Sequence, residues 1–174
     1  MTHHLIDSDF ISCDRLANWA RGKHHFAFAP AALQRLERDR QVVEKHLAAG
    51  APVYGLNTGL GGNLGFRLSD GDLLAFQEQL ILGRMIGMGE PLPMEVVRAA
   101  QLARVIGFAR GGTGVSVGAA QAVMALLDHG ITPVVPTLGS ISAGTWGCVR
   151  IWRHPSSGTV RRFFKGGVTP VVMP

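Results

Sequence analysis

The spacing of apolar residues along the chain predicts a first helix over residues 30–49. The positions that recur at helical intervals are Leu33, Leu36, Val43 and Leu47. Pro30 suits the first turn of such a helix, and Gly50 follows its end. We therefore expect this helix to begin at Pro30 and to end at Ala49.

A second helix is predicted to begin near Ser69. The serine is a favourable N-cap, and Asp70 and Asp72 bring negative charge to the positive end of the helix dipole. An apolar face follows at Leu73, Phe76, Leu80 and Ile81. Gly83 and the run of glycines and prolines over residues 87–93 are expected to end this helix.

Two more helices are predicted in the second half of the chain. The segment from Met94 to Arg110 is apolar nearly all round, which is typical of a helix buried among others. Glycines over residues 111–114 break it, and a segment rich in glycine and alanine follows from about Val115 to Asp128. Residues 131–136 are expected to form an extended connector. The chain is therefore predicted to be mainly α, with loop-rich segments between the helices.

A glycine-rich loop follows the first predicted helix. Residues 53–65 contain five glycines, two asparagines and Tyr54, the single tyrosine of the chain. Glycines at this density serve a backbone that needs positive φ or close approach to another group. A phenol held beside such a loop can act as an acid or base. The alternative is that Tyr54 only packs the junction between helix and loop, as aromatic side chains commonly do.

Composition and charge exclude several classes of protein. The chain has 174 residues, of which 47% are hydrophobic, so it can form a core. No apolar run is long enough to span a membrane, and the first residues lack a secretory signal pattern, so we expect a cytoplasmic protein. Cys13 and Cys148 suggest no disulfide framework, and the histidines at 24, 25, 46 and 129 have no metal-ligand spacing. We therefore expect no metal site.

The net charge of +5 does not indicate a nucleic-acid partner. Residues 150–174 hold five of the 17 basic residues and none of the 12 acidic ones, so residues 1–149 are neutral. A basic tail on a neutral body is not the basic folded face that nucleic-acid binding needs. Nucleotide binding is also disfavoured, because the glycines at residues 59–65 miss the dinucleotide-binding spacing by one residue.

Several motifs occur together in an order that resembles one family. Residues 54–59, Tyr-Gly-Leu-Asn-Thr-Gly, resemble the tyrosine loop of the aromatic amino-acid ammonia-lyases, which include histidine, phenylalanine and tyrosine ammonia-lyases and the related aminomutases. Residues 76–81 with 87–89 resemble the family's Leu-Gln-x-x-Leu helix and Gly-x-Gly turn. Residues 111–115 and 128–140 resemble two later turns that lead to its active site. The resemblance runs over about residues 5–144 and covers the N-terminal part of a longer family protein.

The resemblance implies an activity and a mechanism. The family eliminates ammonia from an aromatic L-amino acid and leaves a trans-unsaturated acid. Its electrophile is a methylidene-imidazolone formed from an Ala-Ser-Gly sequence of the chain itself, with no external cofactor. Tyr54 matches the tyrosine that removes the β-proton of the substrate, and Gly61 lies in the loop that closes over that substrate. The family builds a helical homotetramer, so the resemblance also implies a homo-oligomer.

One departure from the family concerns the substrate. Members that act on histidine carry Ser-His after the Leu-Gln-x-x-Leu helix, and this chain has Gly83 and Arg84 there. A guanidinium has only donors and cannot replace an imidazole as an acceptor. Arg84 either contacts an acidic group of the substrate or is an ordinary solvated cation at a helix end.

A second departure concerns the prosthetic group. Ala143-Gly144-Thr145 occupies the Ala-Ser-Gly place, or Ser142-Ala143-Gly144 does if one residue is deleted. Neither triplet has the central serine whose dehydration forms the methylidene-imidazolone, so the group is not expected to form. In a neighbouring reading frame the codons for Thr145-Trp146 can encode Asp-Leu, the pair that the family has here. This predicts an N-terminal lyase-like region over residues 1–144 and an irregular, frameshifted tail over residues 145–174.

The sequence therefore predicts the N-terminal part of the ammonia-lyase helical fold. Its expected partner is a small aromatic amino acid (histidine, phenylalanine or tyrosine), and this chain itself is expected to be inactive. The alternative is an inactive fragment or interaction module that associates with a lyase-like partner.

Overall fold

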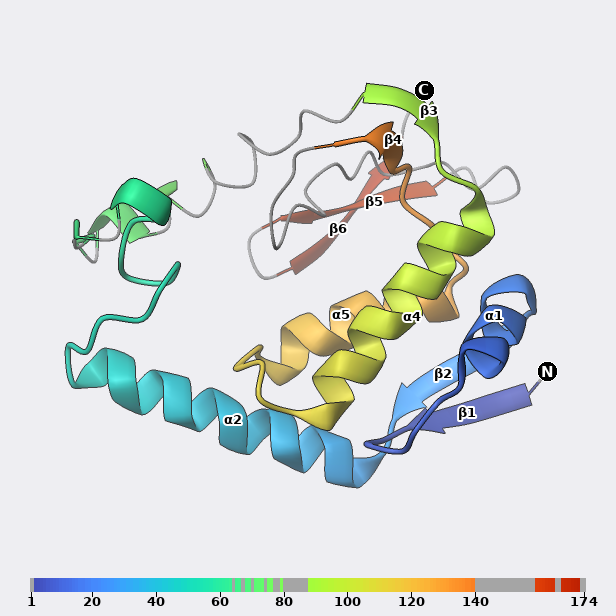
Figure 1. Ribbon diagram of the computed structural model, residues 1–174, viewed down its shortest axis with the longest axis horizontal. Helices are drawn as coiled ribbons and strands as arrows, with labels where there is room; N and C mark the ends of the chain where they lie inside the picture. Colours follow the sequence, from blue (N-terminus) through green and yellow to red (C-terminus); the bar gives the residue numbers. More distant parts are fainter. Residues whose placement is uncertain are drawn as a thin grey trace.

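The structure is a computed structural model of the whole chain. It describes residues 2–63, 65–66, 68–69, 71–73, 75–76, 79, 88–139, 159–164 and 167–172, the last two ranges as backbone only. Figure 1 shows the arrangement of helices and strands. The helix-rich architecture confirms the expected mainly α fold.

The chain begins with a parallel β-α-β unit that the apolar pattern did not predict. Strand β1 (Thr2–Ile6) pairs with strand β2 (His24–Phe28), and helix α1 (Cys13–Arg21) connects them. The backbone N–H of Arg15 donates to the Ser12 hydroxyl, which caps the first turn of α1 at 3.3 Å. Each strand has five residues, and a period-two pattern over so short a run is a weak signal.

Three longer helices follow this unit, and the sequence predicted all three. Helix α2 spans Pro30–Ala48, α4 spans Met94–Arg110 and α5 spans Val117–Asp128. Helix α4 is not buried on every side, since Val96 is 45% exposed while Val97 and Leu102 are fully covered. The predicted end at Arg110 holds because Gly111 adopts φ 88°, a conformation that favours glycine.

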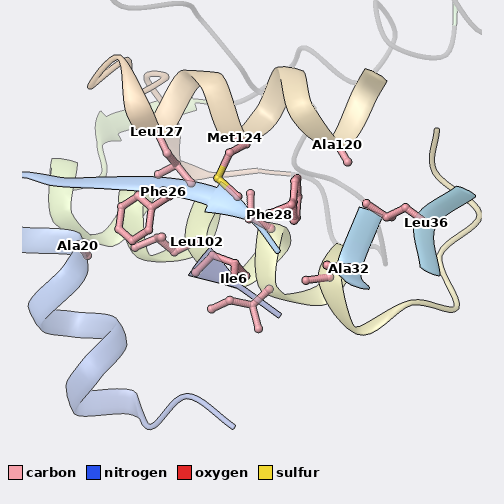
Figure 2. Packing of buried hydrophobic residues seen from close by; sticks show 13 residues of the cluster. Ile6, Ala20, Phe26, Phe28, Ala32, Leu36, Leu102, Ala120, Met124 and Leu127 are labelled. Atoms are coloured by element: carbon pink, nitrogen blue, oxygen red, sulfur yellow. The ribbon is translucent and has the colours of Figure 1, made fainter. Parts of the chain in front are cut away.

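The core lies where β2 meets α4 and α5. Figure 2 shows Met124 and Leu127 of α5 directed toward β2, with Leu102 of α4 on the other side of the strand. Phe26 and Phe28 of β2 are buried between these helices. Burial of one such side chain contributes about 1.5–3 kcal/mol. We call β1, α1, β2, α4, α5 and the first half of α2 the body of the molecule.

The second half of α2 extends beyond the body. Leu36 is fully buried, whereas Val42 is 55% exposed, and Figure 1 shows the helix continuing away from the other elements. The Gly111–Gly114 turn contacts it, because Gly112 donates its backbone N–H to Asp39 Oδ2 at 2.5 Å. Arg35 donates to the carbonyl of Ala109 at 3.0 Å and pairs with Asp7. These bonds tie the middle of α2 to the end of α4.

The remaining described segments are short. Residues 71–73, 75–76 and 79 are helical, as expected after Ser69, and the Ser69 hydroxyl donates to the Asp72 carboxylate at 2.5 Å. Of the apolar positions predicted for this helix, Leu80 and Ile81 lie outside the described residues. Strand β3 (Met88–Pro91) pairs antiparallel with β4 (Pro136–Leu138). The sequence predicted a turn at the place of β3, and the extended connector predicted over residues 131–136 ends where β4 begins.

In the tail the structure describes an antiparallel pair of strands, β5 (Thr159–Phe164) and β6 (Gly167–Val172). The periodicity of the tail predicted no such element. Both strands are rich in β-branched and aromatic residues, which favour extended backbone without needing a regular apolar pattern. No helix in the described part of the chain is long and apolar enough to cross a membrane.

Candidate active-site loop

The loop that carries Tyr54 begins directly at the end of α2. Gly50 adopts φ 70° there, and the backbone N–H of Ala51 donates to the carbonyl of His46 at 2.9 Å. A positive φ at this position ends the helix and turns the chain away from its axis. We call residues 51–66 the Tyr54 loop; Figure 1 shows it at the end of α2 remote from the body.

The side chain of Asn57 fixes the backbone on both sides of the proline that precedes Tyr54. Its Oδ1 accepts from the backbone N–H of Val53 at 2.7 Å, and its Nδ2 donates to the carbonyl of Ala51 at 2.9 Å. An asparagine amide can do both at once because it holds one acceptor and two donors. The asparagine of the Tyr-Gly-Leu-Asn-Thr-Gly motif therefore orients the chain just before the tyrosine.

Thr58 and Gly59 close the base of the loop. Thr58 is 2% exposed, and its hydroxyl donates to the carbonyl of Gly59 at 3.0 Å. The backbone N–H of Gly59 donates to the carbonyl of Phe66 at 2.9 Å, which joins the two sides of the loop. A Cβ added at Gly59 would collide with the carbonyl oxygen of Asn63. Glycine is therefore required at residue 59 by close approach of backbone.

Tyr54 and Gly61, both expected at the site, lie together. The Tyr54 side chain is exposed (62%), and its Oη accepts a hydrogen bond from the backbone N–H of Gly61 at 3.1 Å. Gly61 has φ 55° and opens the short 3-10 helix η1 (Gly61–Asn63). The phenol is thus oriented by a backbone donor while it stays open to solvent. A phenol placed in this way can exchange a proton with a molecule outside the loop.

The other expected site residues are Arg84, Ser142, Ala143 and Gly144. All four lie outside the described residues. Within the part of the chain that the structure does describe, no three histidine, cysteine or acidic side chains gather in a way that could hold a metal ion.

The sequence did not predict how the histidines pair. His25 Nδ1 lies 2.7 Å from Asp128 Oδ1, and His4 Nε2 lies 3.1 Å from His24 Nδ1. Partial desolvation of Asp128 opposes its ionisation, but the hydrogen bonds from His25 and from the backbone of Phe26 prevail and lower its pKa. The His4–His24 contact joins β1 to β2, and the His25–Asp128 contact joins β2 to the end of α5, so both depend on packing between segments distant in sequence.

Comparison with known proteins identifies the family. A sequence model of the aromatic amino acid lyases matches residues 11–145. Histidine ammonia-lyases of Anaeromyxobacter dehalogenans and Deinococcus radiodurans are each 35% identical to this chain over 139 residues, 80% of its length. The chain spans only about a quarter of these relatives, 27% and 26% of their lengths.

Solved structures agree with the fold. Ergothionase from Treponema denticola matches with a TM-score of 0.75 and 27% identity, over 80% of this chain and 28% of that one. The phenylalanine aminomutase of Pantoea agglomerans matches with a TM-score of 0.77 over 97% of this chain and 32% of that one; at 22% identity this shows likeness of fold alone. The chain therefore belongs to the aromatic amino acid lyase family, a family of carbon–nitrogen lyases.

Proposed function

We propose that this chain supplies the catalytic tyrosine loop of an ammonia-lyase that acts on an aromatic L-amino acid, with Tyr54 as the base. The observation that carries the proposal is the hydrogen bond between Gly61 N–H and Tyr54 Oη on an exposed phenol. The family elimination begins with removal of a weakly acidic β-proton. Such a step needs a base whose oxygen is held in place and open to the substrate.

The loop meets these needs through its own bonds. Asn57 fixes the backbone before Tyr54, and Gly61 donates to the phenol oxygen after it. The same N–H can donate to that oxygen before and after the proton moves, so the phenol need not reorient during the transfer. In this proposal Gly61 positions the base and contacts the substrate through the turn that it begins.

The residues present do not fit the family's prosthetic group. The methylidene-imidazolone requires a serine between alanine and glycine, and residues 142–145 read Ser-Ala-Gly-Thr. We therefore propose that the group does not form in this chain and that the chain alone is inactive. Intact-mass spectrometry should show the full unmodified mass, without the loss of one water on cyclisation and a second on dehydration. A mass lower by both waters would contradict the proposal.

We propose only the class of the substrate, an aromatic L-amino acid. The curated relatives are named histidine ammonia-lyases, whereas Gly83-Arg84 replaces the Ser-His pair that the histidine-selective members carry. An aromatic amino acid with an acidic ring substituent or a free carboxylate near Arg84 agrees with a donor-only side chain. We propose that the whole protein works in the cytoplasm as a homo-oligomer, with residues 145–174 as a non-native tail.

A chimera tests the role of Tyr54 without depending on the altered triplet. Residues 1–139 of this chain would replace the matching segment of the Anaeromyxobacter dehalogenans histidine ammonia-lyase, which then supplies its own remaining sequence. Product formation from histidine, phenylalanine and tyrosine would be followed by ultraviolet absorbance. With an active chimera, Tyr54→Phe should lower kcat by about 10²–10⁴-fold, the range for loss of a general base.

The control for this experiment is Phe10→Tyr, which makes the reverse change at an 82% exposed ring outside the loop. It should leave kcat within about twofold, as expected for a surface change. An active chimera in which Tyr54→Phe also keeps full kcat would overturn the assignment of Tyr54 as the base.

A second function, association with a lyase-like partner, is favoured by exposed apolar side chains where β3 and β4 pair. Met88 is 70% exposed and Leu138 is 63% exposed, and the two residues are opposite each other in the register. Exposed apolar residues that adjoin one another often mark an interaction site. Sedimentation of the purified chain mixed with the Anaeromyxobacter dehalogenans histidine ammonia-lyase should show a joint assembly, and Met88→Ser with Leu138→Ser should weaken it.

A further inference from the structure

A cavity of about 600 Å³ opens at the end of the body opposite the Tyr54 loop. It lies between the end of α1, the start of β2, the first turns of α4 and the end of α5. None of its lining residues belongs to the Tyr54 loop, and Figure 1 shows that loop at the far end of α2. The volume is within the range of sites that bind small molecules.

The walls of the cavity carry more cations than their carboxylates can neutralise. The permanent cations are Arg21, Lys23 and Arg98, and the carboxylates are Glu95 and Asp128. Glu95 already pairs with Arg21 at 3.4 Å, and Asp128 already pairs with an imidazole at 2.7 Å. Within the described residues, Lys23 and Arg98 therefore have no carboxylate partner.

Arg98 is the buried cation of the cavity. It is 9% exposed, and its Nε donates to the carbonyl of Ala20 at 3.0 Å. No other acceptor for its guanidinium occurs among the described residues, and burial lowers its pKa. An arginine stays charged even when it is desolvated, so a neutral carbonyl leaves its charge uncompensated. The terminal amino groups form a planar fork that suits two oxygens of one anion.

Other lining residues complete the chemistry of the cavity. His24 and His129 provide imidazole nitrogens that can donate to an oxygen. Ala20, Met94 and Leu127 provide apolar wall, which suits the carbon part of an organic anion better than a bare inorganic ion. The cavity thus combines a buried cation, an exposed cation and an apolar surface.

We propose that this cavity binds a small organic oxyanion that carries two or more negative charges, a phosphate ester or a dicarboxylate, with Arg98 as its central ligand. Lys23, which is exposed at the rim, supplies the second positive charge. A dianion could contact both of the cations that lack carboxylate partners. This site would give the chain a ligand separate in chemistry from an aromatic amino acid.

Calorimetric titration of the full chain tests the proposal. Inorganic phosphate and succinate are the probes, and sodium chloride at matched ionic strength is the control. Saturable heat with phosphate alone assigns the site to phosphate esters, and saturable heat with succinate alone assigns it to dicarboxylates. Heat with both supports the shared oxyanion chemistry. Heats no larger than those of chloride for both probes would overturn the site.

Variants identify the ligands. Arg98→Gln should weaken binding at least about tenfold, as for loss of a charge-assisted bidentate contact. Lys23→Gln alters only an exposed side chain, so it tests the site even if the buried substitution disturbs folding; it should weaken binding about threefold. Arg104→Gln, on the same helix but outside the cavity, is the matched control. Equal affinity in Lys23→Gln and Arg104→Gln would contradict the proposed role of the rim cation.

Discussion

The body of the molecule is held together by buried side chains, whereas the Tyr54 loop is held by hydrogen bonds among its own residues. In the body, Leu36, Leu102 and Leu127 are covered almost completely. Among the described residues of the loop, Thr58 and Gly59 are the buried ones, and Asn57 bonds to the backbone of Ala51 and Val53. Burial of apolar side chains contributes much free energy of folding but does not depend on precise orientation. Hydrogen bonds contribute less net free energy of folding, but they fix the orientation of the groups that they join. The hydrogen bonds of the loop therefore define the position of the Tyr54 phenol but stabilise the loop less than buried side chains stabilise the body.

The largest expected effect is the loss of stability when a fully buried side chain of the body is shortened. Leu102→Ala should lower the free energy of unfolding by about 2–5 kcal/mol, because the removed side chain is fully buried between α4 and β2. Urea unfolding followed by circular dichroism measures this loss. Phe10→Ala, at an 82% exposed position, is the control and should change stability by less than about 0.5 kcal/mol. Similar losses in both variants would mean that the body is not the stabilising unit.

An intermediate effect is expected from a side chain added in the loop. Gly59→Ala forces its Cβ against the carbonyl oxygen of Asn63, which should disrupt the loop at a cost of about 1–3 kcal/mol. Hydrogen exchange of residues 53–61 should become about tenfold faster or more, while exchange in α4 stays unchanged. Gly62→Ala is the matched control, since nothing lies within 4 Å of a Cβ there. Exchange that becomes equally faster in the loop and in α4 would show that the two regions open together and would remove the distinction between them.

The smallest expected effect is a pH dependence at the edge of the body. Desolvation lowers the pKa of His4 from its ordinary value of 6.5, and His24, Arg15 and His3 lower it further. The folded state therefore binds fewer protons than the unfolded state, so stability is complete above pH 6.5 and is lost as the pH falls toward the folded-state pKa.

Urea midpoints measured between pH 7.5 and 5 check this dependence on pH. His4→Gln should flatten the decline, whereas His46→Gln, on the exposed second half of α2, should keep the wild-type profile. A decline that is the same in His4→Gln and in the unaltered chain would assign the titration to another group.

The sequence predicted the body unevenly. The limits of α4 were predicted at Met94 and Arg110 because a long apolar run ends at a cluster of glycines, and the positive φ of Gly111 in the structure agrees with that end. The pairing of β1 with β2 was not predicted, since parallel strands meet through a crossover and leave little signal in five residues each. In the loop, motif resemblance identified Tyr54 and Gly61. The hydrogen bond between them was not predicted, because it depends on the fold of the loop between them.

The cavity beside Arg98 could not be predicted from the sequence. Its residues come from four elements that are distant in sequence, and each charge by itself resembles an ordinary surface group. Only the parallel β-α-β unit brings the end of α1 and the start of β2 to the ends of α4 and α5. The excess of cations over carboxylates at this cavity is therefore not visible in the sequence.

The bond between Asp39 and Gly112 has a geometric consequence for the tyrosine. It anchors the middle of α2, so the free half of the helix works as a rigid arm that sets the height and rotation of the loop at its tip. An α-helix turns through roughly 100° for each residue. Insertion of a single alanine after Val42 would carry the phenol around the helix axis by about that angle without changing any contact inside the loop. The length of an exposed helix, as much as the motif at its end, therefore determines the position and direction of this phenol relative to the body.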